Sequence, residues 1–113
     1  MCNTIPALPI HQPWANLIAT GKKTLETRPR RIHYRGPLAI CSTKRSIEEP
    51  RGCVIAIVQV VDCRPFTPQD AAAACCPWRP SAWAWVLADV QQVDPSPVRG
   101  QQGIFRIPWP LPS

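Results

Sequence analysis

Residues 53–61, Cys-Val-Ile-Ala-Ile-Val-Gln-Val-Val, decide the fold class of this chain. The stretch contains neither Pro nor Gly, and most of its residues are Val or Ile, whose branched side chains favour strands. An almost continuous apolar run of this length is typical of a strand that is buried on both faces. The sequence therefore predicts a β-rich core built around residues 53–61.

Shorter segments on both sides of this stretch continue the β pattern. The further expected strands are residues 7–10, 24–28, 38–42, 82–88 and 103–107. In the segment 24–28, alternate side chains of a strand would face opposite sides. Thr24, Glu26 and Arg28 would point one way, and Leu25 and Thr27 the other. This alternation places a carboxylate and a guanidinium on one face.

Two short helices are predicted between the strands. The segment 13–21 has Pro13 at a position suited to the first helical residue and Gly21 at one suited to the left-handed residue beyond the end. Thr67 and Asp70, three residues apart, resemble a capping box before residues 71–74. Because neither helix is long enough to connect parallel strands, we expect a mainly β (α+β) fold, a small and mostly antiparallel β-barrel with two short helices.

The size and composition of the chain indicate one small globular domain over residues 1–113, with a Pro-rich tail at 108–113. Its 113 residues are 45% hydrophobic and 18% charged. No apolar run approaches the roughly 20 residues that a membrane-spanning helix needs. The first residues lack the basic and apolar regions of a signal peptide. We therefore expect a cytoplasmic protein without membrane contact, and a monomer.

Positive charge is concentrated in one segment of the chain. The formal net charge is +6, from 13 Lys and Arg against 7 Asp and Glu. Residues 22–51 hold nine of these bases and three of the acids, and therefore the whole excess. A localised basic field indicates a polyanionic partner, most often nucleic acid, with a merely solubilising surface as the alternative.

The six cysteines do not follow a disulfide or zinc pattern. They lie at positions 2, 41, 53, 63, 75 and 76, with no Cys-x-x-Cys pair, and the chain has two His. Without an export signal, we expect free thiols, no metal and no cofactor. The adjacent Cys75 and Cys76 are interpreted as a spare thiol pair, with a redox role as the alternative.

The segment 21–28, Gly-Lys-Lys-Thr-Leu-Glu-Thr-Arg, is the densest group of chemically useful side chains. It brings an ammonium, Lys23, a carboxylate, Glu26, and a guanidinium, Arg28, into eight residues. Glu26 and Arg28 are two apart on an expected strand and are predicted to pair. Such a pair in a cleft can hold a base edge or a phosphate in a fixed pose. On an open surface it would be an ordinary ion pair of little energetic value.

Several motifs, in this order, resemble the ASCH domain, the activating-signal-cointegrator-homology branch of the PUA-like β-barrels. They cover residues 7–107 and comprise Gln-Pro-Trp-Ala at 12–15, Gly-x-Lys-x-x-Glu-x-Arg at 21–28, Tyr-Arg-Gly-Pro-Leu at 34–38, Ser-x-Lys at 42–44, the apolar stretch 52–63, Trp-Ala-Trp-Val-Leu at 83–87 and Arg-Gly-Gln-Gln-Gly-Ile-Phe at 99–105. His11 departs from the pattern, because relatives often carry Arg before Gln-Pro-Trp. The resemblance implies a small barrel with a basic cleft that binds RNA, another single-stranded nucleic acid or a nucleotide.

The resemblance also implies which side chains lie in or near that cleft. The expected nucleic-acid-binding residues are Gln12, Trp14, Lys23, Glu26, Arg28, Arg35, Ser42, Lys44 and Trp85. Trp14 or Trp85 would offer a ring on which a base stacks, although packing in the core is the commoner use of Trp.

A hydrolase is the alternative function. The bacterial N4-acetylcytidine amidohydrolases resemble this chain and use a Lys, a Thr and a Glu. Lys23 matches their Lys, but Glu26 stands at the Thr position, and no Glu follows Glu49. Other relatives are ribonucleases, and for a metal-independent cut Lys23 and Glu26 are the candidate acid and base. We favour binding, with turnover of RNA or a modified nucleoside as the runner-up and protein docking through the Pro-rich tail as a third class.

Overall fold

The structure, a computed structural model, describes residues 3–45, 48–100 and 103–110. These residues contain six strands and two short α-helices. In chain order they are β1 (Thr4–Ile10), α1 (Trp14–Ala19), β2 (Leu25–Arg28), β3 (Gly36–Ser42), β4 (Cys53–Pro65), the 3-10 turn η1 (Pro68–Asp70), α2 (Ala71–Ala74), β5 (Trp83–Pro97) and β6 (Phe105–Pro108). The mainly β class with two short helices is confirmed. In these residues no helix is long and apolar enough to cross a membrane.

One mixed sheet contains these strands in the order β2-β5-β4-β3-β1-β6. β1 and β3 are parallel, with Ala7 opposite Ala39, and the other neighbouring strands are antiparallel. The sheet is mostly antiparallel as expected, but the short helices do not prevent one parallel pair, so the sheet is mixed. Residues 11–35 connect β1 to β3 through α1 and β2 together, which is long enough for a parallel crossover.

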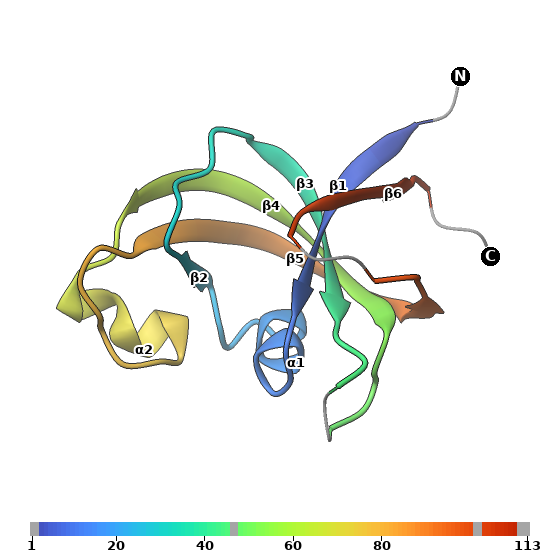
Figure 1. Ribbon diagram of the computed structural model, residues 1–113, viewed down its shortest axis with the longest axis horizontal. Helices are drawn as coiled ribbons and strands as arrows, with labels where there is room; N and C mark the ends of the chain where they lie inside the picture. Colours follow the sequence, from blue (N-terminus) through green and yellow to red (C-terminus); the bar gives the residue numbers. More distant parts are fainter. Residues whose placement is uncertain (1–2, 46–47, 101–102, 111–113) are drawn as a thin grey trace.

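The sheet curls without closing, so the predicted barrel was wrong. β4 and β5 form a long arch with α2 at one end and β1, β3 and β6 at the other (Figure 1). Three register shifts between β4 and β5, over residues 54–62, mark irregularities of the kind that bend strands. The curl brings the edge strand β2 near β1, where Arg28 Nη2 donates a hydrogen bond to the Pro9 carbonyl oxygen at 3.2 Å.

Several strands reach further than the sequence patterns predicted. β1 begins at Thr4 rather than at residue 7, β4 continues to Pro65, and β5 continues to Pro97. The second half of β5 is mostly exposed and polar, so its ladder with β4 extends beyond any hydrophobic signal. β6 ends at Pro108, and residues 111–113 of the predicted tail lie outside the described residues.

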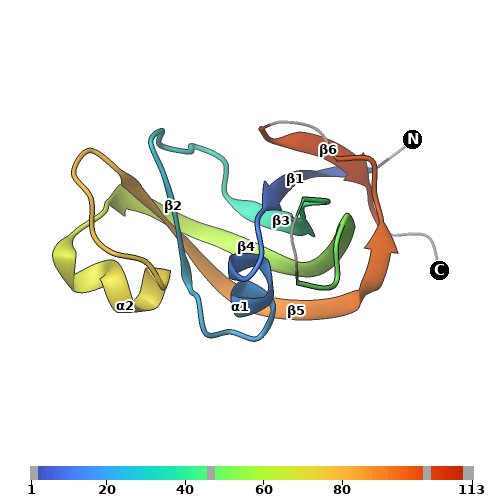
Figure 2. The ribbon, with the colours of Figure 1, turned by 60° about the horizontal axis from the view of Figure 1, so that its bottom comes forward.

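Helix α1 covers the concave side of the sheet. The turned view places α1 and β2 in front of β4 (Figure 2). Ile18 packs in one cluster with Leu38 and Ile40, while the alternate residues Ala39 and Cys41 face a second cluster with β1 and β6. Burying each large aliphatic side chain contributes about 1.5–3 kcal/mol. This packing therefore holds α1 against β3.

The capping box before α2 is confirmed. Asp70 accepts hydrogen bonds from the Thr67 backbone N–H at 3.0 Å and the Thr67 hydroxyl at 2.9 Å. It also pairs with two guanidinium nitrogens of Arg64, at 2.7 and 3.0 Å. The Arg64 guanidinium and the Thr67 N–H hold the pKa of the Asp70 carboxyl well below its usual range. With Ala74 packed against Leu25, this network fixes α2 beside β2.

Candidate nucleic-acid interface

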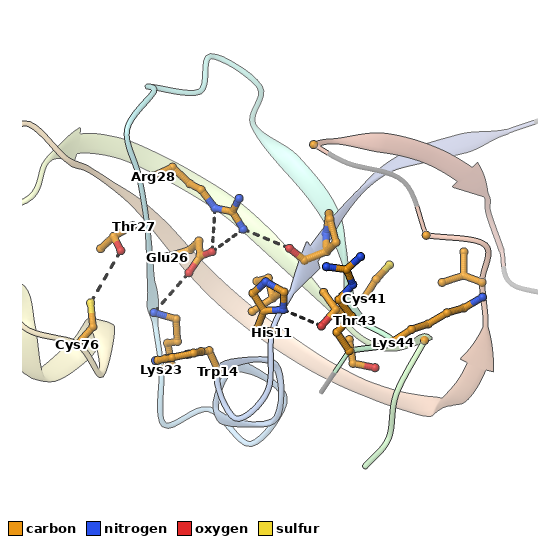
Figure 3. A pocket seen from close by; sticks show the side chains of 18 of the residues that line it. His11, Trp14, Lys23, Glu26, Thr27, Arg28, Cys41, Thr43, Lys44 and Cys76 are labelled. Atoms are coloured by element: carbon orange, nitrogen blue, oxygen red, sulfur yellow. Dashed lines mark hydrogen bonds and ion pairs between the residues drawn. The ribbon is translucent and has the colours of Figure 1, made fainter. Parts of the chain in front are cut away.

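A groove of about 860 Å³ lies between β2, the start of α1 and the final residues of β1 and β3 (Figure 3). The charged residues in its lining are Lys23, Glu26, Arg28, Lys44, Arg45 and Arg79. Among the described residues, the lining thus holds five cations and one carboxylate. These residues come from chain segments that are far apart in the sequence.

A buried ion-pair cluster forms one wall of the groove. Lys23 is 3% exposed and Glu26 7%, and Lys23 Nζ lies 3.4 Å from Glu26 Oε1. Glu26 Oε2 accepts a hydrogen bond from Arg28 Nε at 3.0 Å and forms an ion pair with Arg28 Nη2 at 2.9 Å, as the dashed lines of Figure 3 show. The pairing of Glu26 with Arg28 that the alternation in β2 predicted is confirmed.

The end of α2 positions this wall. Lys23 Nζ donates to the Ala74 carbonyl oxygen, and the Thr24 backbone N–H donates to the Ala73 carbonyl at 2.9 Å. Trp14 Nε1 donates to the next carbonyl, that of Cys75, at 3.3 Å. These three successive carbonyl groups therefore connect the end of α2 to the residues just before β2 and to the start of α1. The sequence carries no signal for this role, because backbone atoms of small residues supply it.

The opposite rim carries Lys44 and Arg45, which are both exposed. Gly52 lies beneath Lys44 with φ of +66°, and a Cβ at Gly52 would come within 3.0 Å of Lys44 Cγ. A glycine at this position therefore leaves room for the Lys44 stem and suits the left-handed backbone. His11 Nδ1 is 2.8 Å from Thr43 Oγ1 on the same rim.

Six of the nine predicted residues line the groove, and one of them, Ser42, contributes a buried hydroxyl. Trp14, Lys23, Glu26, Arg28 and Lys44 line it, as does Ser42. The Ser42 hydroxyl is tied to the Cys53 backbone N–H and carbonyl, both at 3.3 Å. Its hydrogen bonds therefore hold β3 and β4 together at the groove.

The structure does not bring Gln12, Arg35 or Trp85 into the groove lining. Gln12 accepts from the Asn16 backbone N–H at 2.9 Å and so supports the start of α1. Trp85 is 5% exposed in the core, which leaves its ring no free face for a base. Arg35 donates to the Ile32 carbonyl at 2.9 Å, away from the groove.

Sequence reasoning missed several residues of the lining. Arg79 follows α2 and donates to the Thr27 hydroxyl at 3.3 Å, and Cys76 Sγ lies 3.8 Å from the same oxygen. Nothing in their spacing connects positions 76 and 79 with β2. Cys41 also borders the groove, but burial raises the pKa of its thiol to about 12. Its thiol is therefore neutral near pH 7 and a poor nucleophile.

Comparison with known proteins agrees with this architecture. The family model described as ASCH domain matches residues 8–97. The crystal structure of ASCH from Zymomonas mobilis has a TM-score of 0.72 at 17% identity, over 90% of this chain and 86% of that chain. Crystal structures of two mutant proteins of the Zymomonas mobilis ASCH have TM-scores of 0.65 at 18% identity, over 90% of this chain and 88% and 87% of theirs. At this identity the likeness shows the fold alone. A search of curated protein sequences finds no match.

Proposed function

This chain belongs to the ASCH domain family, a PUA-like family often associated with RNA binding, and we propose that it binds RNA, or another single-stranded nucleic acid or nucleotide, in the groove. The observation that carries the proposal is the charge of the lining, in which Glu26 is the one acid beside five cations among the described residues. A concave basic surface concentrates phosphate groups and speeds their association.

The ion-pair cluster supports binding more than hydrolysis. Each Glu26 oxygen already faces a cation, Oε1 toward Lys23 and Oε2 toward Arg28. A general base needs an oxygen that can reach the proton it removes, whereas a paired carboxylate is well suited to orient neighbouring donors. Arg28 Nε and Nη2 hold the cluster and Pro9, and its third nitrogen, Nη1, is left to donate to a ligand.

The side of the groove opposite the ion-pair cluster offers the remaining contacts that a nucleotide needs. Lys44 and Arg45 are exposed, and neither has an ion-pair partner among the described residues. Trp14 is 39% exposed and lines the groove, and stacking of a base on such a ring contributes about 1–3 kcal/mol. Phosphates at Lys44 and Arg45 with a base on Trp14 would fill the groove.

A binding titration with matched charge variants tests the proposal. Fluorescence anisotropy of a labelled single-stranded RNA is measured with the intact protein and with K44A/R45A, which removes two exposed cations from the groove. We expect at least a tenfold loss of affinity. The control K22A/R106A removes the same charge from exposed positions outside the groove lining. Equal losses in both double variants would contradict a groove site.

Product analysis in the same samples separates binding from turnover. We expect no cleaved RNA and no altered nucleoside with the intact protein. Arg28→Ala should weaken binding by about 2 kcal/mol, because it removes a charged donor and leaves Glu26 with one partner fewer. Multiple-turnover product that disappears in Glu26→Gln while binding persists would replace the binding proposal with the hydrolase.

A further inference from the structure

A second basic surface begins where the groove ends. The basic rim, defined as Arg30, Arg31, His33 and Arg35, is exposed at all four positions. Between them Ile32 is 8% exposed in the core, and Tyr34 is half-buried. The alternation turns the basic side chains outward while the apolar ones anchor the segment.

The backbone of the rim is tied to the folded core. Trp85 Nε1 donates to the Arg30 carbonyl at 3.0 Å, and the Ile32 backbone N–H donates to Cys63 Sγ at 3.4 Å. Arg35 Nη1 closes the segment on the Ile32 carbonyl at 2.9 Å. The backbone that carries the rim cations is therefore fixed before any ligand arrives, which lowers the entropic cost of binding.

A row of side chains connects the groove to the rim. Arg28, in the groove lining, lies directly opposite Trp83 in the antiparallel ladder of β2 and β5. Opposed residues of such a ladder project from the same face, with Cβ atoms about 5 Å apart. The Arg31 guanidinium lies over the Trp83 ring, 4.8 Å from its centroid. Arg28, Trp83 and Arg31 thus follow one another from the groove to the rim, with Arg31 in contact with the ring.

The rim carries little compensating negative charge. In the part of the chain that the structure describes, Arg35 alone of the rim has a carboxylate within 4 Å, that of Asp62 at 3.9 Å. Both of these side chains are well exposed, so this pair contributes little. Neither Arg30 nor Arg31 has an ion-pair partner among the described residues. A surface of this kind fits the phosphates of a chain better than a single small anion.

We propose that the basic rim is a second phosphate-binding surface, and that the ligand is a single-stranded polynucleotide that leaves the groove past Arg28 and crosses Arg31. This inference rests on the proposed nucleic-acid function and adds the length and the path of the ligand. The nucleotide in the groove contacts Trp14 and Lys44, and the nucleotides that follow it contact Arg30 and Arg31 through phosphate. A free nucleotide occupies the groove alone and gains nothing from the rim.

A length series of labelled single-stranded RNA tests the path. Oligonucleotides of 2, 4, 8 and 12 nucleotides are titrated against the intact protein, the rim variant R30A/R31A, the groove variant K44A/R45A and the control K22A/R106A. All six substituted side chains are exposed, and thermal unfolding of each variant checks the fold. We expect affinity to rise with length in the intact protein. The rim variant should lose about tenfold for the 12-mer and nothing for the dinucleotide, and its slope of log K against log salt should fall by roughly 1–2.

The groove and rim variants separate failure of the path from failure of the site. The path would be overturned if the rim variant bound the 12-mer as tightly as the intact protein does, or if it lost no more affinity for the 12-mer than the control variant loses. In either case the groove proposal would stand. Equal affinity for the dinucleotide and the 12-mer would also overturn the path. Loss of dinucleotide binding in the groove variant supports the proposed function, and its retention would refute that function independently of the rim.

Discussion

Replacing Glu26 with Gln is expected to destabilise the fold by about 2–3 kcal/mol, because it removes the negative charge between two cations. Lys23 is the critical partner, since its side chain is 2% exposed. In the variant its ammonium would keep the Ala74 carbonyl as an acceptor but would lose the carboxylate that offsets its desolvation. The same change weakens the hold on the Arg28 guanidinium, which pairs with Glu26 Oε2.

The magnitude follows from how deeply each partner is buried. Breaking a fully buried ion pair costs about 3–5 kcal/mol. Arg28 is 31% exposed, so water stabilises it in part, and the Gln side chain still offers one acceptor, which together place the expected loss at about 2–3 kcal/mol. For a chain of this length the entropy of unfolding is about 0.24 kcal/mol/K, so the Tm should fall by roughly 8–12 °C.

Thermal and urea unfolding, followed by circular dichroism, measure this loss. Glu49→Gln is the matched control, because Glu49 pairs with Arg51 at 2.8 Å while both side chains are well exposed. It should cost less than about 0.5 kcal/mol. Adding Lys23→Met to Glu26→Gln should restore part of the stability, since the unpaired buried ammonium is then gone.

Two results would refute the reasoning. One is a Tm for Glu26→Gln within about 2 °C of the control variant, which would mean that the cluster is hydrated and energetically unimportant. The other is a further loss of stability when Lys23→Met is added, which would mean that the ammonium is satisfied without the carboxylate.

The other predictions concern salt, thiols and acid. RNA affinity should fall more than about tenfold between 50 and 200 mM salt, because phosphate contacts release counterions; a flat profile by anisotropy would contradict a phosphate-driven site. All six thiols should react with a thiol reagent in the unfolded protein under non-reducing conditions, and fewer than six reactive thiols would indicate a disulfide. In the folded protein Cys41 should be among the slowest thiols to react, because it is buried and its pKa is raised to about 12. Asp70→Asn should cost about 1–2 kcal/mol at pH 7, measured by urea unfolding. Because the pKa of Asp70 is lowered in the folded state, its contribution is complete above the unfolded pKa of about 4 and is lost as the pH falls below it, so the wild type and Asp70→Asn should converge in acid; a difference that stays constant from pH 7 to pH 2 would contradict this role.

Local patterns of the sequence were enough for the elements and for one part of the site. The β-branched run at 53–61, the capping pair Thr67 and Asp70, and the alternation in β2 each depend on residues within a few positions of one another. Period-2 alternation puts Glu26 and Arg28 on one face of any strand, and the structure pairs them. The excess of positive charge is likewise visible in composition alone.

The tertiary structure alone decided the sheet and the groove. The register shifts in β4 and β5 bend the sheet until Arg28 reaches Pro9 without closing a barrel, and strand patterns do not encode where such shifts fall. The same curvature places Trp85 in the core and brings the end of α2, with Ala74, against Lys23. The contact between Lys23 and Ala74 joins residues about fifty positions apart. The geometry of these contacts is the sum of many small backbone rotations, and no short stretch of sequence carries that sum.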